Sequence, residues 1–289
     1  RPPDDERSAP DRRTAPQRDQ PADLPRWEPA LIVAMVGLGI AARLWPRGSL
    51  WLDEALSVNL GRLPLSELPA ALKQDGHPPL YYELLHVWTG VLGTSTFVVR
   101  MMSIITSLLG LPLVWLVGRK AGGARVGMWA VAIWAVLPYG VRYATETRMY
   151  VMVMVLVLVG WWFLDRLWTE PRWPDAAALA VISSALLWSH YWAMWLLAAV
   201  GAATLLRRWL NRDQPNANRE LLLTGGALGL AGLSFLPWLP TLLFQAERTG
   251  TPWGGVERPT TALVITLIDF AGQPSAEPQL MTYALVFLL

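Results

Sequence analysis

Residues 51–82 read WLDEALSVNLGRLPLSELPAALKQDGHPPLYY, and this polar stretch decides how the rest of the chain is arranged. It carries Asp53, Glu54, Asp75 and His77, whereas the other long segments of the chain are apolar enough for lipid. Hydrophobic residues make up 53% of the sequence and charged residues only 16%, in long uncharged blocks. This composition predicts an all-α, polytopic membrane protein rather than soluble domains.

The apolar blocks predict a series of membrane spans at 27–45, 97–118, 126–141, 147–165, 175–189, 191–207 and 220–244. The basic clusters at 119–125 and 207–219 should both face the cytoplasm, and four crossings between them satisfy this requirement. The first span then leads outward, and the span ending at 118 has to begin outside. Residues 46–96 are therefore predicted to stay outside the membrane.

The outer loop 46–96 is predicted to form a platform of surface helices. Residues 55–60 and 65–72, separated by Pro64, read as short amphipathic helices. Residues 77–93 are apolar but begin with a Pro pair and are interrupted by Glu83 and His86, which indicates a helix in the membrane interface rather than a crossing.

The ends of the chain differ in character from its centre. Residues 1–26 are rich in Pro, Arg and Asp, which predicts a disordered cytoplasmic tail rather than a signal peptide. Residues 27–289 are expected to form one transmembrane module. After the span at 220–244 we expect an outer loop, an interfacial helix at 260–270 and an inward span from 279 that the end of the chain truncates.

On this topology the unusual polar clusters all reach the outer face. They are Asp53–Glu54, Asp75–His77, Arg142–Glu146–Arg148–Tyr150, His190–Tyr191 and Glu247–Arg248. The chain has no cysteine, so any chemistry must use carboxylates, His, Arg or Tyr. This mixture suits a site that holds the phosphate of a lipid with cations and activates a hydroxyl with a carboxylate.

Each candidate also has a structural interpretation. Asp53 either caps the helix that follows it or acts as a general base, and Glu54, one residue on, is expected to play a supporting part. His77 is either an ordinary surface histidine or, with His190, part of a phosphate clamp or metal pair, although no His-x-x-x-His spacing is present.

The later clusters leave the same choice open. Arg142 and Glu146 are four residues apart, so they form either an ion-paired belt at the membrane surface or part of a site with Arg148 and Tyr150. The Ser189–Tyr191 turn lies between two Trp-rich spans and is either an interfacial belt or a substrate contact.

A family resemblance rests on these motifs taken together. They are WLDEA at 51–55, DGHPPLYY at 75–82, Arg100 at the start of the second span, YATETRMY at 143–150, SHYW at 189–192 and TPWGG at 251–255. The chain resembles bacterial GT-C glycosyltransferases of family 39, the dolichyl-phosphate-mannose-protein mannosyltransferase group, which includes the lipid A aminoarabinose transferases. The resemblance covers about residues 27–289.

The resemblance implies a GT-C type helical bundle that transfers a sugar, with inversion, from a polyprenyl-phosphate donor at the outer leaflet. It implies that Asp53 is the base, that Glu146 is the second acidic residue and that His77 lies near the donor phosphate. Some aminoarabinose transferases have Lys where this chain has His77. We add Arg142 and Arg148 as phosphate-binding candidates. The substrate-binding candidates are Glu54, Tyr81, Tyr150, His190 and Tyr191.

The expected partners are a polyprenyl-phosphate-linked sugar, membrane lipid and an acceptor that is a lipid, a glycan or a protein, with no nucleic acid. No cofactor is required, and a divalent metal stays open. We expect a multi-pass cell-membrane protein with its active site on the extracytoplasmic side. The alternative is a transporter or lipid flippase with an outer-face binding site, which predicts ionisable residues at mid-membrane on facing spans.

Overall fold

The computed structural model describes residues 25–45, 48–248, 260 and 266. In these ranges the regular elements are helices, which in chain order are α1 (Trp27–Leu44), α2 (Leu52–Gly61), α3 (Leu68–Asp75), α4 (Leu80–Leu92), α5 (Thr96–Val136), α6 (Pro138–Ala144), α7 (Tyr150–Thr169), α8 (Trp173–Ser189), α9 (Ala193–Leu210), α10 (Ala217–Phe235), the 3-10 turn η1 (Leu236–Trp238) and α11 (Leu239–Arg248). The features expected at 1–24, at 249–259, over most of 260–270 and from 279 onward lie outside the described residues.

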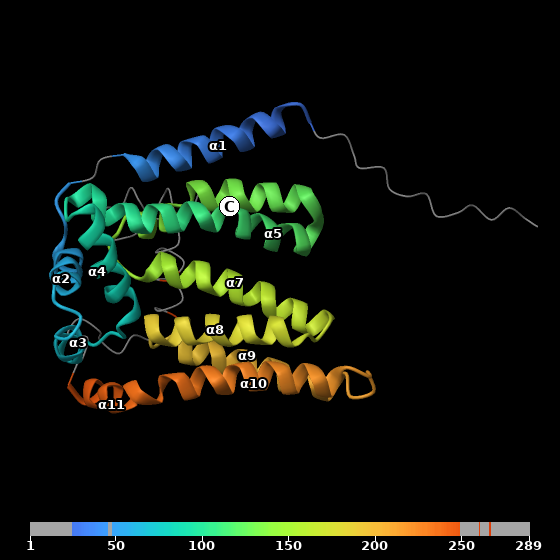
Figure 1. Cartoon of the computed structure of the whole chain (residues 1–289). Coiled ribbons are helices and arrows are strands. Elements are labelled where there is room, and N and C mark those ends of the chain that lie inside the picture. Colours follow the sequence, from blue (N-terminus) through green and yellow to red (C-terminus); the bar gives the residue numbers. More distant parts are fainter. Residues whose placement is uncertain (1–24, 46–47, 249–259, 261–265, 267–289) are drawn as a thin grey trace, which may run out of the picture.

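The long helices form a membrane-spanning bundle (Figure 1). In the described residues, 5 helices are long and apolar enough to cross a membrane: α1, α5, α7, α9 and the run from α10 to α11. α8 is slightly shorter, with 17 residues, and packs against α7 and α10. The predicted all-α polytopic fold is confirmed.

α5 consists of two antiparallel arms rather than one rod. The backbone leaves the helical region at Gly122 and Gly123, and Gly123 has φ 85°, which only glycine adopts without strain. The arms pack closely, since a Cβ on Gly127 would lie 2.8 Å from the Trp115 carbonyl oxygen. These arms are the predicted spans at 97–118 and 126–141.

The predicted end of the second arm at 141 is wrong. The arm stops at Val136, and Leu137 is extended, with ψ 119°. The cause is Pro138, which disfavours the helical conformation at the preceding residue and brings no N–H of its own. The chain restarts as the short helix α6, whose position shapes the polar cluster described below.

Arg43 ties α1 to both arms of α5. This side chain is only 1% exposed, and its Nε donates to Ser107 Oγ at 3.0 Å on the first arm. Its Nη1 donates to the Ala135 carbonyl at 2.5 Å on the second. Gly39, one turn earlier, permits this close approach, because a Cβ there would lie 2.2 Å from the Ala135 carbonyl oxygen. α1 is thereby fixed against both arms of α5.

The platform consists of α2, α3 and α4, which lie across one end of the bundle, and α11 continues α10 to this end and contacts α3 (Figure 1). We call this the platform end. α4 has 13 residues, too few to cross a bilayer, which agrees with the expected interfacial helix at 77–93. A hydrophobic core beneath the platform joins it to the spans; its fully buried members include Leu68, Leu72, Tyr82, Leu85 and Met149.

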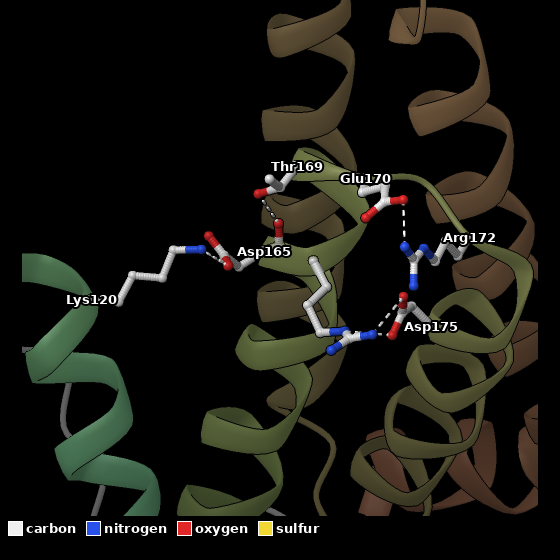
Figure 2. Close-up of a pocket in the computed structure, with 7 residues that line it drawn as sticks. Lys120, Asp165, Thr169, Glu170, Arg172 and Asp175 are labelled. Carbon is white, nitrogen blue, oxygen red and sulfur yellow. Dashed lines mark hydrogen bonds and ion pairs between the residues drawn. The ribbon is translucent and has the colours of Figure 1, made fainter.

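The opposite end of the bundle is held by ion pairs around a cavity of about 210 Å³ (Figure 2). Lys120 of α5 pairs with Asp165 of α7, and Arg166 pairs with Asp175 at the start of α8 at 2.7 Å. Arg172 pairs with Glu170 in the connecting loop at 2.5 Å. Each charged residue lining the cavity has a partner of opposite sign, and these ion pairs link α5 to α7 and α7 to α8.

Candidate active site

A polar cluster at the platform end combines residues from α2, the α3–α4 turn, α5, α6 and the loop before α7. Its members are Asp53, Glu54, Ser57, Asp75, His77, Tyr82, Arg100, Arg142, Glu146 and Arg148. The structure therefore brings together the residues that the sequence predicted for catalysis and phosphate binding. Arg100, Asp75, Ser57 and Tyr82 were not among the predicted site residues.

Glu54 forms the buried foundation of the cluster. Its side chain is 0% exposed, and Arg100 contacts both carboxylate oxygens, from Nε at 2.9 Å and from Nη2 at 2.6 Å. The Thr147 N–H donates to the same carboxylate at 2.9 Å. Burial opposes ionisation, but the hydrogen bonds and charge of Arg100 and the Thr147 N–H hold the pKa of Glu54 below its ordinary value.

This arrangement fits the expected supporting part of Glu54 better than a direct contact with substrate. A carboxylate without exposed surface, already engaged by a bidentate arginine, is not available to a ligand. Glu54 instead connects three parts of the site, because Arg100 also donates to the Gly48 carbonyl at 3.0 Å and Thr147 lies in the loop before α7. Its role is to position its neighbours.

Asp53, the neighbour of Glu54 on α2, faces a different environment. Its side chain is 38% exposed, and Arg148 Nη2 lies 4.0 Å from its carboxylate. The helix-cap interpretation of Asp53 is wrong: the N-cap residue is Trp51, whose N–H is accepted by Glu54 at 3.3 Å. Asp53 is therefore a partly exposed carboxylate beside a buried cation.

Arg148 lies almost wholly within the cluster. It is 4% exposed, its Nη1 donates to Ser57 Oγ at 3.2 Å, and its Nη2 donates to His77 Nε2 at 3.2 Å. Ser57 in turn donates to the Asp53 carbonyl at 2.8 Å. Arg148 thus links α2 to the α3–α4 turn and places a positive charge beside Asp53.

The turn that presents His77 is set by its sequence. α3 ends at Gly76, which has φ 88°, the left-handed conformation that glycine supplies at helix ends, and Pro79 is the N-cap of α4. His77 Nδ1 lies 2.8 Å from Asp75 Oδ2, and its Nε2 accepts from Arg148. Both ring nitrogens are engaged, which argues against His77 as a direct phosphate ligand in this arrangement.

Arg142 and Glu146 form the expected i,i+4 pair, with 2.9 Å between Nε and Oε1. Burial raises the pKa of Glu146 above its ordinary value, although the hydrogen bond and charge of Arg142 oppose the shift. Glu146 Oε2 is buried and has no hydrogen-bond partner among the described residues. Arg142 is more accessible, with 33% of its side chain exposed, so it is the cation of the cluster that a phosphate can reach most easily.

The other substrate-binding candidates divide into two groups. Tyr150 and His190 adjoin the cluster: their rings are 6.1 Å apart, and the Arg148 guanidinium lies 5.7 Å from the Tyr150 ring. Tyr81 is only 1% exposed, in the core beneath the platform, so it does not border the accessible part of the cluster.

The hydroxyl of Tyr191 is engaged in hydrogen bonds within the protein. This hydroxyl accepts from Trp238 Nε1 at 2.8 Å and donates to Gln245. Gln245 of α11 then donates to the Leu72 carbonyl of α3 at 2.8 Å. Through this chain of hydrogen bonds Tyr191 fastens the start of α9 and the end of the α10–α11 run to the platform.

His190 is held in the neutral form. Its Nδ1 accepts from the Trp192 N–H at 3.2 Å, and burial, helped by the charge of Arg148, lowers the pKa of His190 to about 4. With His77 also engaged at both nitrogens, the two histidines are not arranged as a metal pair. In the part of the chain that the structure describes, no group of three or more His, Cys, Asp or Glu could hold a metal ion.

The His190→Gln protein is expected to lose less stability in acid than the wild type. Between pH 6.5, the ordinary pKa of a histidine side chain, and about pH 4 the unfolded chain binds a proton at His190 that the folded protein does not, so stability falls as the pH drops through this window. The loss is at most about 3 kcal/mol, and less in practice because the ring is not fully buried. Unfolding temperatures of both proteins in detergent across this range measure it; equal pH slopes would contradict the assignment.

Comparison with known proteins adds a family match. A sequence model of the family described as dolichyl-phosphate-mannose-protein mannosyltransferase matches residues 76–238, which is more than half of the 289-residue chain. The match begins next to His77 and ends at Trp238, so it includes the Arg142–Arg148 segment but not Asp53. A search of curated proteins found no match.

Proposed function

The chain belongs to the dolichyl-phosphate-mannose-protein mannosyltransferase family of membrane glycosyltransferases, and from this premise we propose the reaction it catalyses. It transfers a sugar from a polyprenyl-phosphate donor to an acceptor hydroxyl at the outer face of the membrane, with inversion at the anomeric carbon. The acceptor is a lipid, a glycan or a protein.

The observation that carries this proposal is the pairing of a partly exposed carboxylate with buried and exposed cations at one end of a membrane bundle. Asp53 is 38% exposed beside Arg148, and Arg142 is accessible next to Glu146. A carboxylate that can take a proton and cations that can hold a phosphate are the two requirements of transfer from a lipid phosphate.

In the proposed step Asp53 accepts the proton of the acceptor hydroxyl, and the oxygen of that hydroxyl forms a bond to the anomeric carbon. The bond from that carbon to the phosphate oxygen breaks, and the lipid phosphate leaves with the electron pair. Because the leaving phosphate is a stabilised anion, no general acid is needed. Attack from the face opposite the phosphate inverts the anomeric centre, unlike the covalent route with two carboxylates.

The structure supports a refined assignment of the phosphate-binding residues. Arg142 offers exposed surface, and Arg148 contributes its charge from beneath Asp53. His77, with its Nε2 accepting from Arg148, holds that arginine in place rather than the phosphate. We assign the direct phosphate contact to Arg142, and Arg148 adds its positive charge beside Asp53.

The outer-face assignment rests on charge. The basic cluster at 119–125 lies around the turn between the arms of α5, and that at 207–219 around the α9–α10 connection; both connections lie at the end of the bundle away from the platform (Figure 1). The positive-inside rule puts that end in the cytoplasm and the platform outside.

Since the chain lacks cysteine, single cysteines at Thr94 and Gln214 can report the side of the membrane on which each position lies. Only the first should react with an impermeant maleimide added outside intact cells.

Membranes containing the full-length protein are expected to transfer label from a polyprenyl-phosphate sugar and not from the matching nucleotide sugar. The rate should be unchanged by a chelator, because Arg142 and Arg148 neutralise the leaving phosphate. The labelled product is measured against membranes without the protein. Transfer only from the nucleotide sugar, or no transfer from a panel of polyprenyl-phosphate sugars, would refute the proposal.

A further inference from the structure

We propose that Asp75 is a positioning residue of this site, which acts through His77 to hold the Arg148 guanidinium beside Asp53. The inference rests on the proposed function for its effect on rate, but its structural part stands on the contacts alone. Asp75 is not among the residues expected to contact a substrate, and in this proposal it does not touch the reacting atoms.

The first step is the fixing of the Asp75 carboxylate. Its side chain is 8% exposed, and the same oxygen, Oδ2, lies 2.8 Å from His77 Nδ1 and accepts from the Tyr82 hydroxyl at 3.0 Å. Tyr82 itself is fully buried in the core beneath the platform. The carboxylate is therefore held rigidly against one nitrogen of the His77 ring.

The second step is the tautomer of His77. A guanidinium has only N–H donors, so His77 Nε2, 3.2 Å from Arg148 Nη2, has to be the acceptor. The proton of the neutral ring then lies on Nδ1, where Asp75 accepts it. Without Asp75 the ring is free to carry its proton on Nε2, which would place two donors face to face and push Arg148 away.

The third step is the position of Arg148. Its Nη1 is held by Ser57 of α2 and its Nη2 by His77, so the guanidinium is fixed from two sides at 4.0 Å from Asp53. Burial alone would raise the pKa of Asp75, yet the hydrogen bonds from His77 Nδ1–H and the Tyr82 hydroxyl, together with the Arg148 charge, keep that pKa below its ordinary value. Asp75 thus remains an anion, and the chain Tyr82–Asp75–His77–Arg148 transmits a fixed geometry to the proposed base.

The tautomer is measured directly by solid-state NMR of the full-length protein labelled with ¹⁵N-histidine in lipid bilayers. The His77 signal is identified as the one that disappears from the spectrum of the His77→Gln protein. We expect the Nδ1–H tautomer in the wild type and its loss in Asp75→Ala. An Nε2–H tautomer at His77 in the wild type would overturn the proposal, whatever the activity of the protein.

The effect on rate is measured with a labelled polyprenyl-phosphate sugar. Asp75→Ala is expected to lower kcat about tenfold to a hundredfold, the factor that corresponds to losing one hydrogen bond to a charged group. The KM for the donor should change less, because Arg142 is untouched. Asp75→Asn keeps an acceptor oxygen, and it should keep the tautomer and most of the rate. The matched control is Glu83→Ala, which removes an exposed carboxylate of α4 and should transfer as the wild type does.

The two arms separate the possible failures. If the wild type has the Nδ1–H tautomer but transfers no sugar, the proposed function fails and the structural link stands. If Asp75→Ala loses the tautomer yet keeps the wild-type kcat, Asp75 is not a positioning residue. If Asp75→Ala does not fold, Asp75→Asn decides: a kept tautomer with a loss of kcat above about tenfold would contradict the link, since it exceeds the weakening of one hydrogen bond.

Discussion

The Asp53→Asn protein is expected to transfer sugar at least about a hundredfold more slowly than the wild type, because an amide cannot take the proton of the acceptor hydroxyl. The fold should survive the change. Asp53 is 38% exposed and lies 4.0 Å from Arg148, and a carboxylate so placed contributes little to stability. Initial rates with a labelled polyprenyl-phosphate sugar and the unfolding temperature of the same preparation measure the two effects.

The control for this prediction is Glu83→Gln, which makes the same chemical change at an exposed carboxylate of the platform. It should leave both the rate and the unfolding temperature at their wild-type values. An Asp53→Asn protein that transfers within about threefold of the wild-type rate would remove Asp53 from the role of base, since a missing general base is worth roughly a hundredfold or more.

The Arg100→Met protein is expected to lose about 3–5 kcal/mol of stability, the usual effect of leaving one charge of a buried pair without its partner. Glu54 is 0% exposed, and Arg100 supplies two of its hydrogen bonds. The double variant Glu54→Leu with Arg100→Met should recover much of the loss, because it removes both charges. Denaturant unfolding in detergent measures the three free energies.

Arg142→Met provides the matched comparison. The Arg142–Glu146 pair has similar length, 2.9 Å, but the arginine is 33% exposed and Glu146 is not fully buried, so the removal of Arg142 should cost less stability than the removal of Arg100. If the Arg100→Met protein were no less stable than the Arg142→Met protein, the buried Glu54–Arg100 pair would not be the ion pair that stabilises the site most.

The membrane-spanning helices were largely predictable from the sequence because they depend on long apolar segments. The apolarity of a segment is a local property that needs no knowledge of contacts. The prediction failed at 137–141, where the apolar run continues but Pro138 ends the helical arm. A greater weight on that proline would have placed α6 correctly.

The division of labour between Asp53 and Glu54 was only partly predictable. Adjacent residues on a helix point about 100° apart, so Asp53 and Glu54 could be expected to face different environments. Which one did so depends on Arg100, 46 positions along the chain from Glu54. An arginine at the head of an apolar span signals a buried partner, and this signal could have indicated Arg100 as a member of the site.

The tyrosines show why contacts could not be predicted from motifs. The motifs SHYW and HPPLYY place aromatic hydroxyls at the platform end of the bundle, but the partner of each hydroxyl depends on the tertiary packing. Tyr191 meets Trp238 and Gln245, and Tyr82 meets Asp75. Both tyrosine hydroxyls make hydrogen bonds within the protein. A sequence motif cannot distinguish such a supporting tyrosine from one that contacts a substrate.

The most direct test of the central claim is the anomeric configuration of the product that the full-length protein makes from an isotopically labelled polyprenyl-phosphate sugar, read by NMR. A single displacement with Asp53 as the base predicts an anomeric centre inverted with respect to the donor. A product with retained configuration would mean that a second carboxylate forms a covalent intermediate. That result would contradict the account of this cluster as a site with one base and a departing lipid phosphate.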